Sequence, residues 1–145
     1  MRATLDLIER TESNEHYLKL RSSFRRLDAN SNDQAFFARV THRTEELDKT
    51  LRREIVAYLN HYELVAIGCD QGILDEGFYR SWMRSHLVRD WTLARPLIEA
   101  ARTNPADPVP AAYIGFENMA IRFRSPENLN WLRRAVAPTG RTRPR

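Results

Sequence analysis

Residues 47–72 constrain the fold more than any other stretch, because their apolar side chains recur at steps of three and four residues. That spacing places them on one face of a helix with 3.6 residues per turn. Gly72 follows the last apolar position, and glycine readily adopts the left-handed conformation that ends many helices. The sequence therefore predicts one long amphipathic helix, whose buried face carries Leu47, Leu51, Ile55, Tyr58, Leu59, Tyr62, Ala66 and Cys69.

The same periodicity resumes after Gly72 and predicts a second long helix over residues 76–102. Pro96 lies inside it, so we expect either a kink there or a break near residues 89–91. Shorter amphipathic segments flank the two helices, and their aromatic residues, Trp82 included, are assigned mostly to the core by their spacing. Short connections favour antiparallel neighbours. We therefore predict an all-α single compact domain of six or seven helices, built around an antiparallel pair at about 45–71 and 76–102.

The chain of 145 residues is long enough for one domain with a substantial core. Its formal net charge of +4 comes from the C-terminal end, because the last thirteen residues hold five arginines and no acid. The other 18 basic residues are balanced by 19 acidic ones. We expect a helical domain over 1–136 and a disordered arginine-rich tail over 137–145. Contacts to phosphates or to an acidic partner would then involve Arg133, Arg134, Arg141, Arg143 and Arg145.

The chain shows no run of apolar residues long enough to span a membrane and no signal-peptide pattern near its start. Cys69 is the only cysteine, so an internal disulfide is impossible and a reducing compartment is expected. We therefore expect a cytoplasmic protein, or one at the cytosolic face of a membrane if an N-terminal anchor precedes this sequence. The thiol itself is expected to be buried and inert.

The polar residues closest to the apolar face of the 47–72 helix are Asn60 and Glu63. A partly buried carboxylate must be paired or protonated, so we expect Glu63 to pair with arginines of the following helix at 80, 84 or 89. The favoured interpretation is a structural polar network that fixes the register of two helices. The alternative is a ligand pocket in which Glu63 acts as a general base. Either site would be formed by Asn60, Glu63, Arg89, Asp90 and Trp91.

Catalytic and metal motifs are absent from the sequence. It contains no phosphate-binding glycine loop, no nucleophile elbow and no zinc-protease motif. Glu12 and His16 share a helix face, but two ligands do not make a metal site. His61 and Glu63 are two residues apart and point in different directions on a helix. We therefore predict no metal and no cofactor, and we favour a non-enzymatic protein.

Several blocks of sequence, in order, resemble a bacterial family known as domain-of-unknown-function family 4760. They are RATLDLIE near the start, the LR…YLN-x-YE-x-VA block, GILDE-x-FY, VRDW and YIGFENMAIRF. The resemblance runs from about Arg2 to about Phe123. It implies a compact helical domain without an established activity. It also implies that many relatives carry a membrane anchor directly before this segment.

Three functions remain open at this stage. The first is a helical protein-interaction or regulatory domain whose partner is another protein. The second is an inhibitor or nucleic-acid-proximal factor of phage or mobile-element type, touching phosphates only through the tail. The third is a small-molecule-binding module centred on Glu63. The sequence does not determine the oligomeric state.

Overall fold

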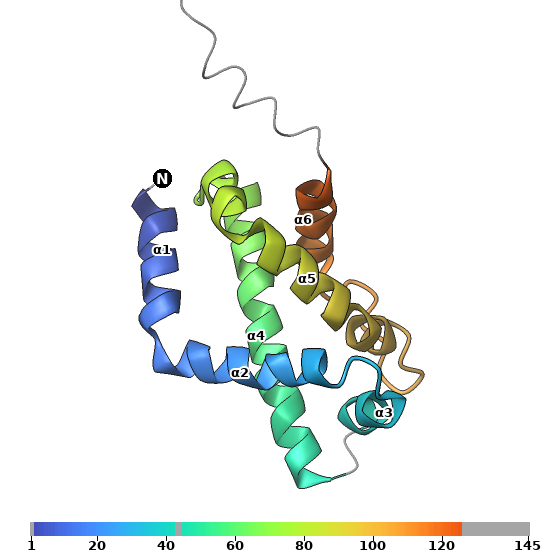
Figure 1. Ribbon diagram of the computed structural model, residues 1–145. Coiled ribbons are helices and arrows are strands. Elements are labelled where there is room, and N and C mark those ends of the chain that lie inside the picture. The colour runs from blue at the N-terminus through green and yellow to red at the C-terminus, as the bar shows by residue number, and fades with distance from the viewer. Residues whose placement is uncertain (1, 43–44, 126–145) are drawn as a thin grey trace, which may run out of the picture.

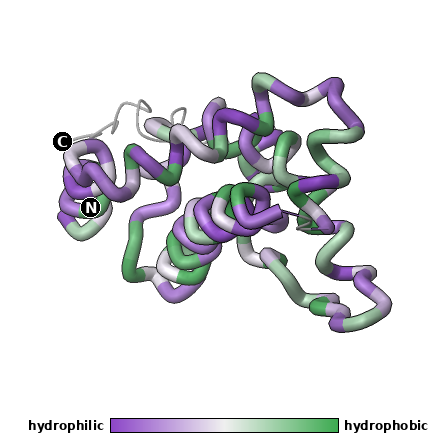
Figure 2. Tube along the Cα trace, turned by 90° about the horizontal axis from the view of Figure 1, so that it is seen from below, coloured by the Kyte–Doolittle hydropathy of each residue, from purple (hydrophilic) through white to green (hydrophobic). Residues whose placement is uncertain are grey.

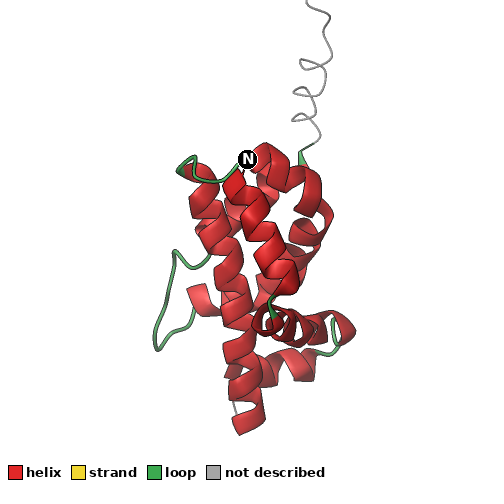
Figure 3. Cartoon of the chain, turned by 90° about the vertical axis from the view of Figure 1, so that its left-hand side faces the viewer, coloured by secondary structure: helices red, strands yellow, loops and turns green. Residues whose placement is uncertain are grey.

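A computed structural model describes residues 2–42 and 45–125 of the chain. Those residues form helices and connecting loops, with no strand among them (Figure 3). The predicted all-α class is confirmed, and no helix in the described part of the chain is long and apolar enough to cross a membrane. The helices are α1 (Arg2–Ser13), α2 (Glu15–Ala29), α3 (Gln34–His42), α4 (Glu46–Asp70), α5 (Glu76–Arg102) and α6 (Ile114–Arg124).

Helix α4 ends as the sequence predicts. Gly72 has a φ of +70°, a left-handed conformation that costs a residue with a Cβ free energy. Its amide donates to the Cys69 carbonyl at 3.0 Å, and the Ile73 amide donates to the Gly68 carbonyl at 2.9 Å. These two bonds satisfy carbonyls that the last turn would otherwise leave without partners. The chain can then reverse within a few residues and start α5 at the Asp75 cap, whose carboxylate accepts from the Phe78 amide.

Helix α4 runs through the centre of the molecule, with α2 crossing it and α5 and α6 to one side (Figure 1). It packs mainly against α2 and α6, while α5 packs mainly against α6. Direct contact between α4 and α5 is limited, and each of the two long helices packs more extensively on α6 than on the other. The reason is that large side chains, Tyr62 and Phe116 among them, fill the space between the helices. Ion pairs from Arg122 of α6 to Asp70 and Glu76 hold α6 near the α4–α5 turn.

Helix α5 continues through Pro96, so the alternative of a break near residues 89–91 is wrong. Pro96 lies on the exposed side of the helix. The missing amide and the crowded preceding turn therefore face solvent, where water can satisfy the freed carbonyl. The consequence for the fold is that Leu97, Ile98 and Ala101 remain in register with the rest of α5 and reach the core side of the molecule.

Apolar and polar positions alternate along the helices (Figure 2). Two sequence assignments to the core are wrong. Leu47 is 79% exposed because it lies in the first turn of α4, which extends beyond its neighbours. Trp82 is 57% exposed because the first turns of α5 bury a different face, which carries Tyr79 and Arg80. The predicted tail over 137–145 lies outside the described residues.

We expect replacement of Gly72 with alanine to lower the free energy of unfolding by about 1 kcal/mol, because the added Cβ disfavours a positive φ. The measurement is urea denaturation followed by circular dichroism. Gly77→Ala is the matched control, since Gly77 is helical and its added Cβ would meet only Asp75 Oδ1 at an ordinary 3.4 Å. Equal stability of both variants would contradict the role assigned to Gly72.

Candidate functional site

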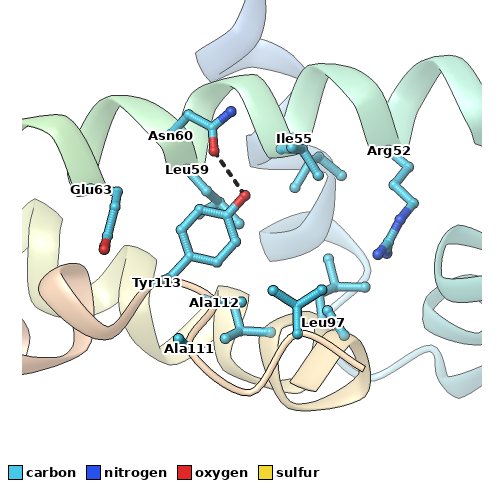
Figure 4. A pocket seen from close by; sticks show the side chains of 13 residues that line it. Arg52, Ile55, Leu59, Asn60, Glu63, Leu97, Ala111, Ala112 and Tyr113 are labelled. Atoms are coloured by element: carbon cyan, nitrogen blue, oxygen red, sulfur yellow. Dashed lines mark hydrogen bonds between the residues drawn. The ribbon is translucent and has the colours of Figure 1, made fainter. Parts of the chain in front are cut away.

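A cavity of about 430 Å³ lies between the middle of α4, the last turns of α5 and the loop that leads into α6 (Figure 4). Helix α4 provides one wall, because residues spaced three, four and seven apart share one helical face. The lining is mostly apolar, with polar groups at the two ends of the α4 wall. It is formed by Arg52, Ile55, Val56, Leu59, Asn60, Glu63, Leu97, Ile98, Ala101, Val109, Ala111, Ala112 and Tyr113.

The loop over residues 103–113 forms the outer wall of the cavity, and side chains on both sides hold it in place. Arg102, in the last turn of α5, donates two hydrogen bonds to the Ala112 carbonyl, from Nε at 3.0 Å and from Nη2 at 2.7 Å. The same guanidinium pairs with Glu117 of α6 at 2.8 Å. The Val109 amide donates to the Ala101 carbonyl at 3.2 Å. The second half of the loop is therefore fixed at Val109 and Ala112, while its small residues Ala111 and Ala112 leave room beneath it.

Tyr113 closes one end of the cavity (Figure 4). Its hydroxyl donates to Asn60 Oδ1 at 3.1 Å, which joins the loop to α4. Its φ of 56° is left-handed, an uncommon conformation for a residue with a large side chain. Partial burial raises the pKa of the Tyr113 hydroxyl, and the nearby Arg52 charge acts in the opposite direction. The phenol is therefore neutral at physiological pH and able to donate this bond.

Glu63 caps the N-terminus of α6. Its Oε1 accepts from the Gly115 amide at 3.1 Å and its Oε2 from the Phe116 amide at 2.7 Å. Tyr113, at the N-cap position of α6, makes no side-chain cap bond, so Glu63 satisfies amides that this end of the helix leaves unpaired. A Cβ on Gly115 would approach Glu63 Oε1 to 3.0 Å, which explains why glycine suits this position.

The expectation that arginines of α5 would pair with Glu63 is wrong. Arg80 donates to the Ser125 carbonyl at 2.6 Å and Arg84 to the Phe123 carbonyl at 2.8 Å. Both therefore hold the last turn of α6, while Glu63 holds its first turn. The physical reason is that backbone amides at a helix N-terminus compete well for a carboxylate, and sequence spacing does not show which helix ends lie nearby.

Two of the other predicted site residues, Arg89 and Asp90, belong to a separate polar network centred on the buried Asp90 carboxylate. Asp90 is only 2% exposed, and its Oδ2 accepts from the hydroxyls of Tyr58 at 2.9 Å and Tyr62 at 2.8 Å. Arg89 lies 3.3 Å from Asp90 Oδ1. Burial, with a smaller contribution from the Asp90 charge, raises the pKa of Tyr58 above its ordinary value. Both hydroxyls thus stay protonated and serve as donors.

Trp91 is an aromatic packing residue next to this network. Its ring meets that of Phe116 edge-on, with centroids 5.3 Å apart, and Phe116 stacks on Tyr62 at 4.6 Å. The five predicted site residues therefore fall into two separate groups in the structure. Asn60 and Glu63 line the cavity, whereas Arg89, Asp90 and Trp91 are not among its lining residues.

Sequence reasoning assigned Tyr58 and Tyr62 only to the apolar face of α4 and missed their role as hydrogen-bond donors. A signal was present, because two tyrosines four residues apart on a buried face need partners for their hydroxyls. Asp90, the acid in the middle of the neighbouring helix, was the natural candidate. What the sequence lacked was the placement of Asp90 opposite both tyrosines.

A second hollow, an apolar groove of about 600 Å³, lies between α1 and α4. Its exposed apolar residues include Leu64 at 67% and Ile73 at 66% exposure, with Asp6 and Arg10 of α1 alongside. His61 lines the same groove, and burial lowers its pKa to about 4, so the imidazole is neutral at physiological pH.

The remaining candidate chemistry is limited. Burial raises the pKa of the Cys69 thiol to about 11, so the thiol is protonated at neutral pH. Within residues 2–42 and 45–125, no three His, Cys, Asp or Glu side chains cluster as a metal site would require. The five arginines proposed to contact phosphates, at 133, 134, 141, 143 and 145, lie outside the described residues.

Together, these features define an all-helical domain with a partly open, mostly apolar cavity and a separate buried polar network. The chain belongs to the family described as Domain of unknown function (DUF4760), whose pattern it matches over residues 1–123. The resemblance inferred from the sequence blocks is therefore confirmed. Searches of curated proteins and of solved structures give no match.

We expect Glu63→Ala to lower the free energy of unfolding by about 1–2 kcal/mol, because it removes both acceptors from the α6 N-terminus. Glu63→Gln keeps one acceptor oxygen and is expected to lose less. The measurement is urea denaturation followed by circular dichroism. Glu99→Ala is the control, since Glu99 makes an exposed pair with Arg95 and little change is expected. A Glu63→Ala variant as stable as the native protein would show that the cap contributes nothing.

Proposed function

We propose that this domain binds a small, mostly apolar molecule in the cavity between α4, α5 and the loop over residues 103–113, and that it acts as a ligand-binding regulatory module. The observation that carries the proposal is the cavity itself. Its volume of about 430 Å³ lies within the range of small-molecule sites, and its lining combines apolar walls with a few polar groups.

The polar groups at the cavity support binding rather than proton transfer. Glu63 accepts two backbone hydrogen bonds, so its carboxylate is committed to capping α6. The Asn60 carbonyl oxygen accepts from Tyr113. A general base needs a lone pair aimed at the proton it removes, whereas both carboxylate oxygens of Glu63, the residue suggested for that role, are directed at the α6 amides. These contacts favour a rigid pocket that orients a ligand.

A fluorescence experiment can test this function. We expect the neutral solvatochromic dye Nile red to brighten on binding and octanol to displace it, because both can transfer apolar surface from water into the cavity. Ala111→Phe should lower the affinity for the dye about tenfold by filling the cavity beneath the loop. Ala106→Phe is the matched control, since Ala106 lies in the same loop but does not line the cavity. Unchanged dye binding in Ala111→Phe would contradict the assignment.

A second candidate function, protein binding, is favoured by the α1–α4 groove. We propose an amphipathic helix of a partner protein as its occupant, because Leu64 and Ile73 offer apolar anchors while Asp6 and Arg10 offer one charge of each sign on the α1 side. Contiguous exposed apolar surface of this kind commonly marks an interaction site. Nucleic-acid contact through the arginines of the tail stays a prediction, supported by the charge of the sequence alone.

The groove can be tested with the native protein as bait. We expect the double variant Leu64→Ser, Ile73→Ser to lose a partner that the native protein captures. A peptide with the sequence of the partner's helical segment should compete with that partner for the groove. Trp82→Ser is the control, because Trp82 is an equally large exposed residue that does not line the groove. A partner held equally well by the double variant would exclude the groove as the docking site.

A further inference from the structure

The α1–α4 groove has walls that the rest of the fold holds in place. Helix α1 packs mainly against α2 and touches α4 little, so the groove stays open between the two helices, which run alongside each other (Figure 1). The first turn of α1 is anchored by Thr4, a buried residue whose hydroxyl accepts from the Asp75 amide at 2.8 Å. The last turn of α1 is followed at once by Asn14, whose side chain caps α2. The groove is therefore formed before any partner binds.

Both walls of the groove are continuous helical faces. Residues 3, 6, 7 and 10 of α1 form one wall, and residues 61, 64, 65 and 68 of α4 form the other. The two sets share the same spacing, which places four residues on one side of a helix. Leu64, Ile67 and Ile73 line the groove and are exposed although they are large and apolar. Two helices that present such a surface can pack against a second pair of helices, as in a four-helix bundle.

The charges beside this apolar surface are complementary to a second copy of themselves. Asp6 and Arg10 are exposed, line the groove one turn apart on α1, and form no ion pair within residues 2–42 and 45–125. When two copies of α1 meet antiparallel across a two-fold axis, Asp6 of each copy can lie opposite Arg10 of the other. A parallel arrangement would bring like charges together. The charge pattern therefore favours the antiparallel pairing of two identical helices.

We infer that the occupant of the groove is a second copy of this chain, so that the protein forms a two-fold symmetric dimer. This inference rests on the proposed protein-binding role of the groove and adds the identity of the partner. The two α1 helices lie antiparallel at the centre of the interface, each next to α4 of the other copy. Leu64, Ile67 and Ile73 are then removed from water, which stabilises the dimer. The two Asp6–Arg10 pairs fix the antiparallel orientation.

Sedimentation equilibrium of the full chain measures the monomer–dimer equilibrium. We expect a dimer at micromolar concentration. Asp6→Arg and Arg10→Asp should each raise the dissociation constant at least about tenfold, because each places like charges opposite each other twice across the axis. Glu9→Arg is the matched control, since it reverses an exposed charge on α1 that does not line the groove. Circular dichroism checks that each variant is folded.

Two further combinations distinguish a direct ion pair from a loss of helix stability. The double variant Asp6→Arg, Arg10→Asp should dimerise again, because the exchanged charges are still complementary. A mixture of the two single variants should form a heterodimer, detected by native mass spectrometry, because two cations of one copy then face two anions of the other. Neither recovery would occur if the substitutions only unfolded α1, or if the dimer formed without these pairs.

The apolar part of the interface is tested with Leu64→Ser, Ile73→Ser, which should be monomeric. A dimer that survives this double variant and both charge reversals would use another face, and the inference would be wrong. A native chain that stays monomeric up to about 1 mM would exclude a second copy as the occupant. The pull-down described above then decides separately whether a different protein binds the groove, so the two proposals can fail independently.

Discussion

The architecture of the candidate site depends on one interaction, the Glu63 carboxylate capping the first turn of α6. It fixes where α6 begins relative to α4, because two backbone amides meet two carboxylate oxygens at 3.1 and 2.7 Å. The chain must therefore pass from the end of α5 at Arg102 to Ile114 across the face of α4. Arg102 and Asn60 hold that loop where it meets α6, at Ala112 and Tyr113. The cavity is the space left beneath it, where Ala111 and Ala112 are too small to reach α4.

A second constraint comes from the buried carboxylate of Asp90. Removing an acid from water is costly unless its oxygens are bound, and here two tyrosine hydroxyls and Arg89 are within hydrogen-bonding distance. Such a network accepts few alternative arrangements of α4 against α5, since a shift of either helix would leave buried donors without partners. It therefore supplies the fixed register that sequence reasoning had attributed to Asn60 and Glu63. Helix α6, stacked through Phe116 on Tyr62, completes this core.

The helices could be predicted from sequence because their signals are local: apolar periodicity, the Asp75 cap and Gly72. The pairing of helices could not, since it depends on which side chains fill the space between them. The same limit applies to the site. Asn60 and Glu63 stood out as polar residues beside an apolar face, but their partners lie more than fifty residues away in the sequence. The polarity of a residue can be read locally, whereas its partner is set by the tertiary fold.

The polar groups of the cavity are separate from the buried Asp90 network, and this separation bears on how a ligand could act on the rest of the domain. Cavity and core share no side chain among the predicted site residues, yet both touch the first turn of α6: Glu63 accepts from the Phe116 amide, and Tyr62 stacks on the Phe116 ring. A ligand beneath the loop would press on Tyr113, which directly precedes α6 and holds a left-handed conformation. Displacement of Tyr113 would be transmitted to the first turn of α6, because the amides of that turn are bound to Glu63. Helix α6 is thus the element through which occupancy of the cavity can reach the aromatic core.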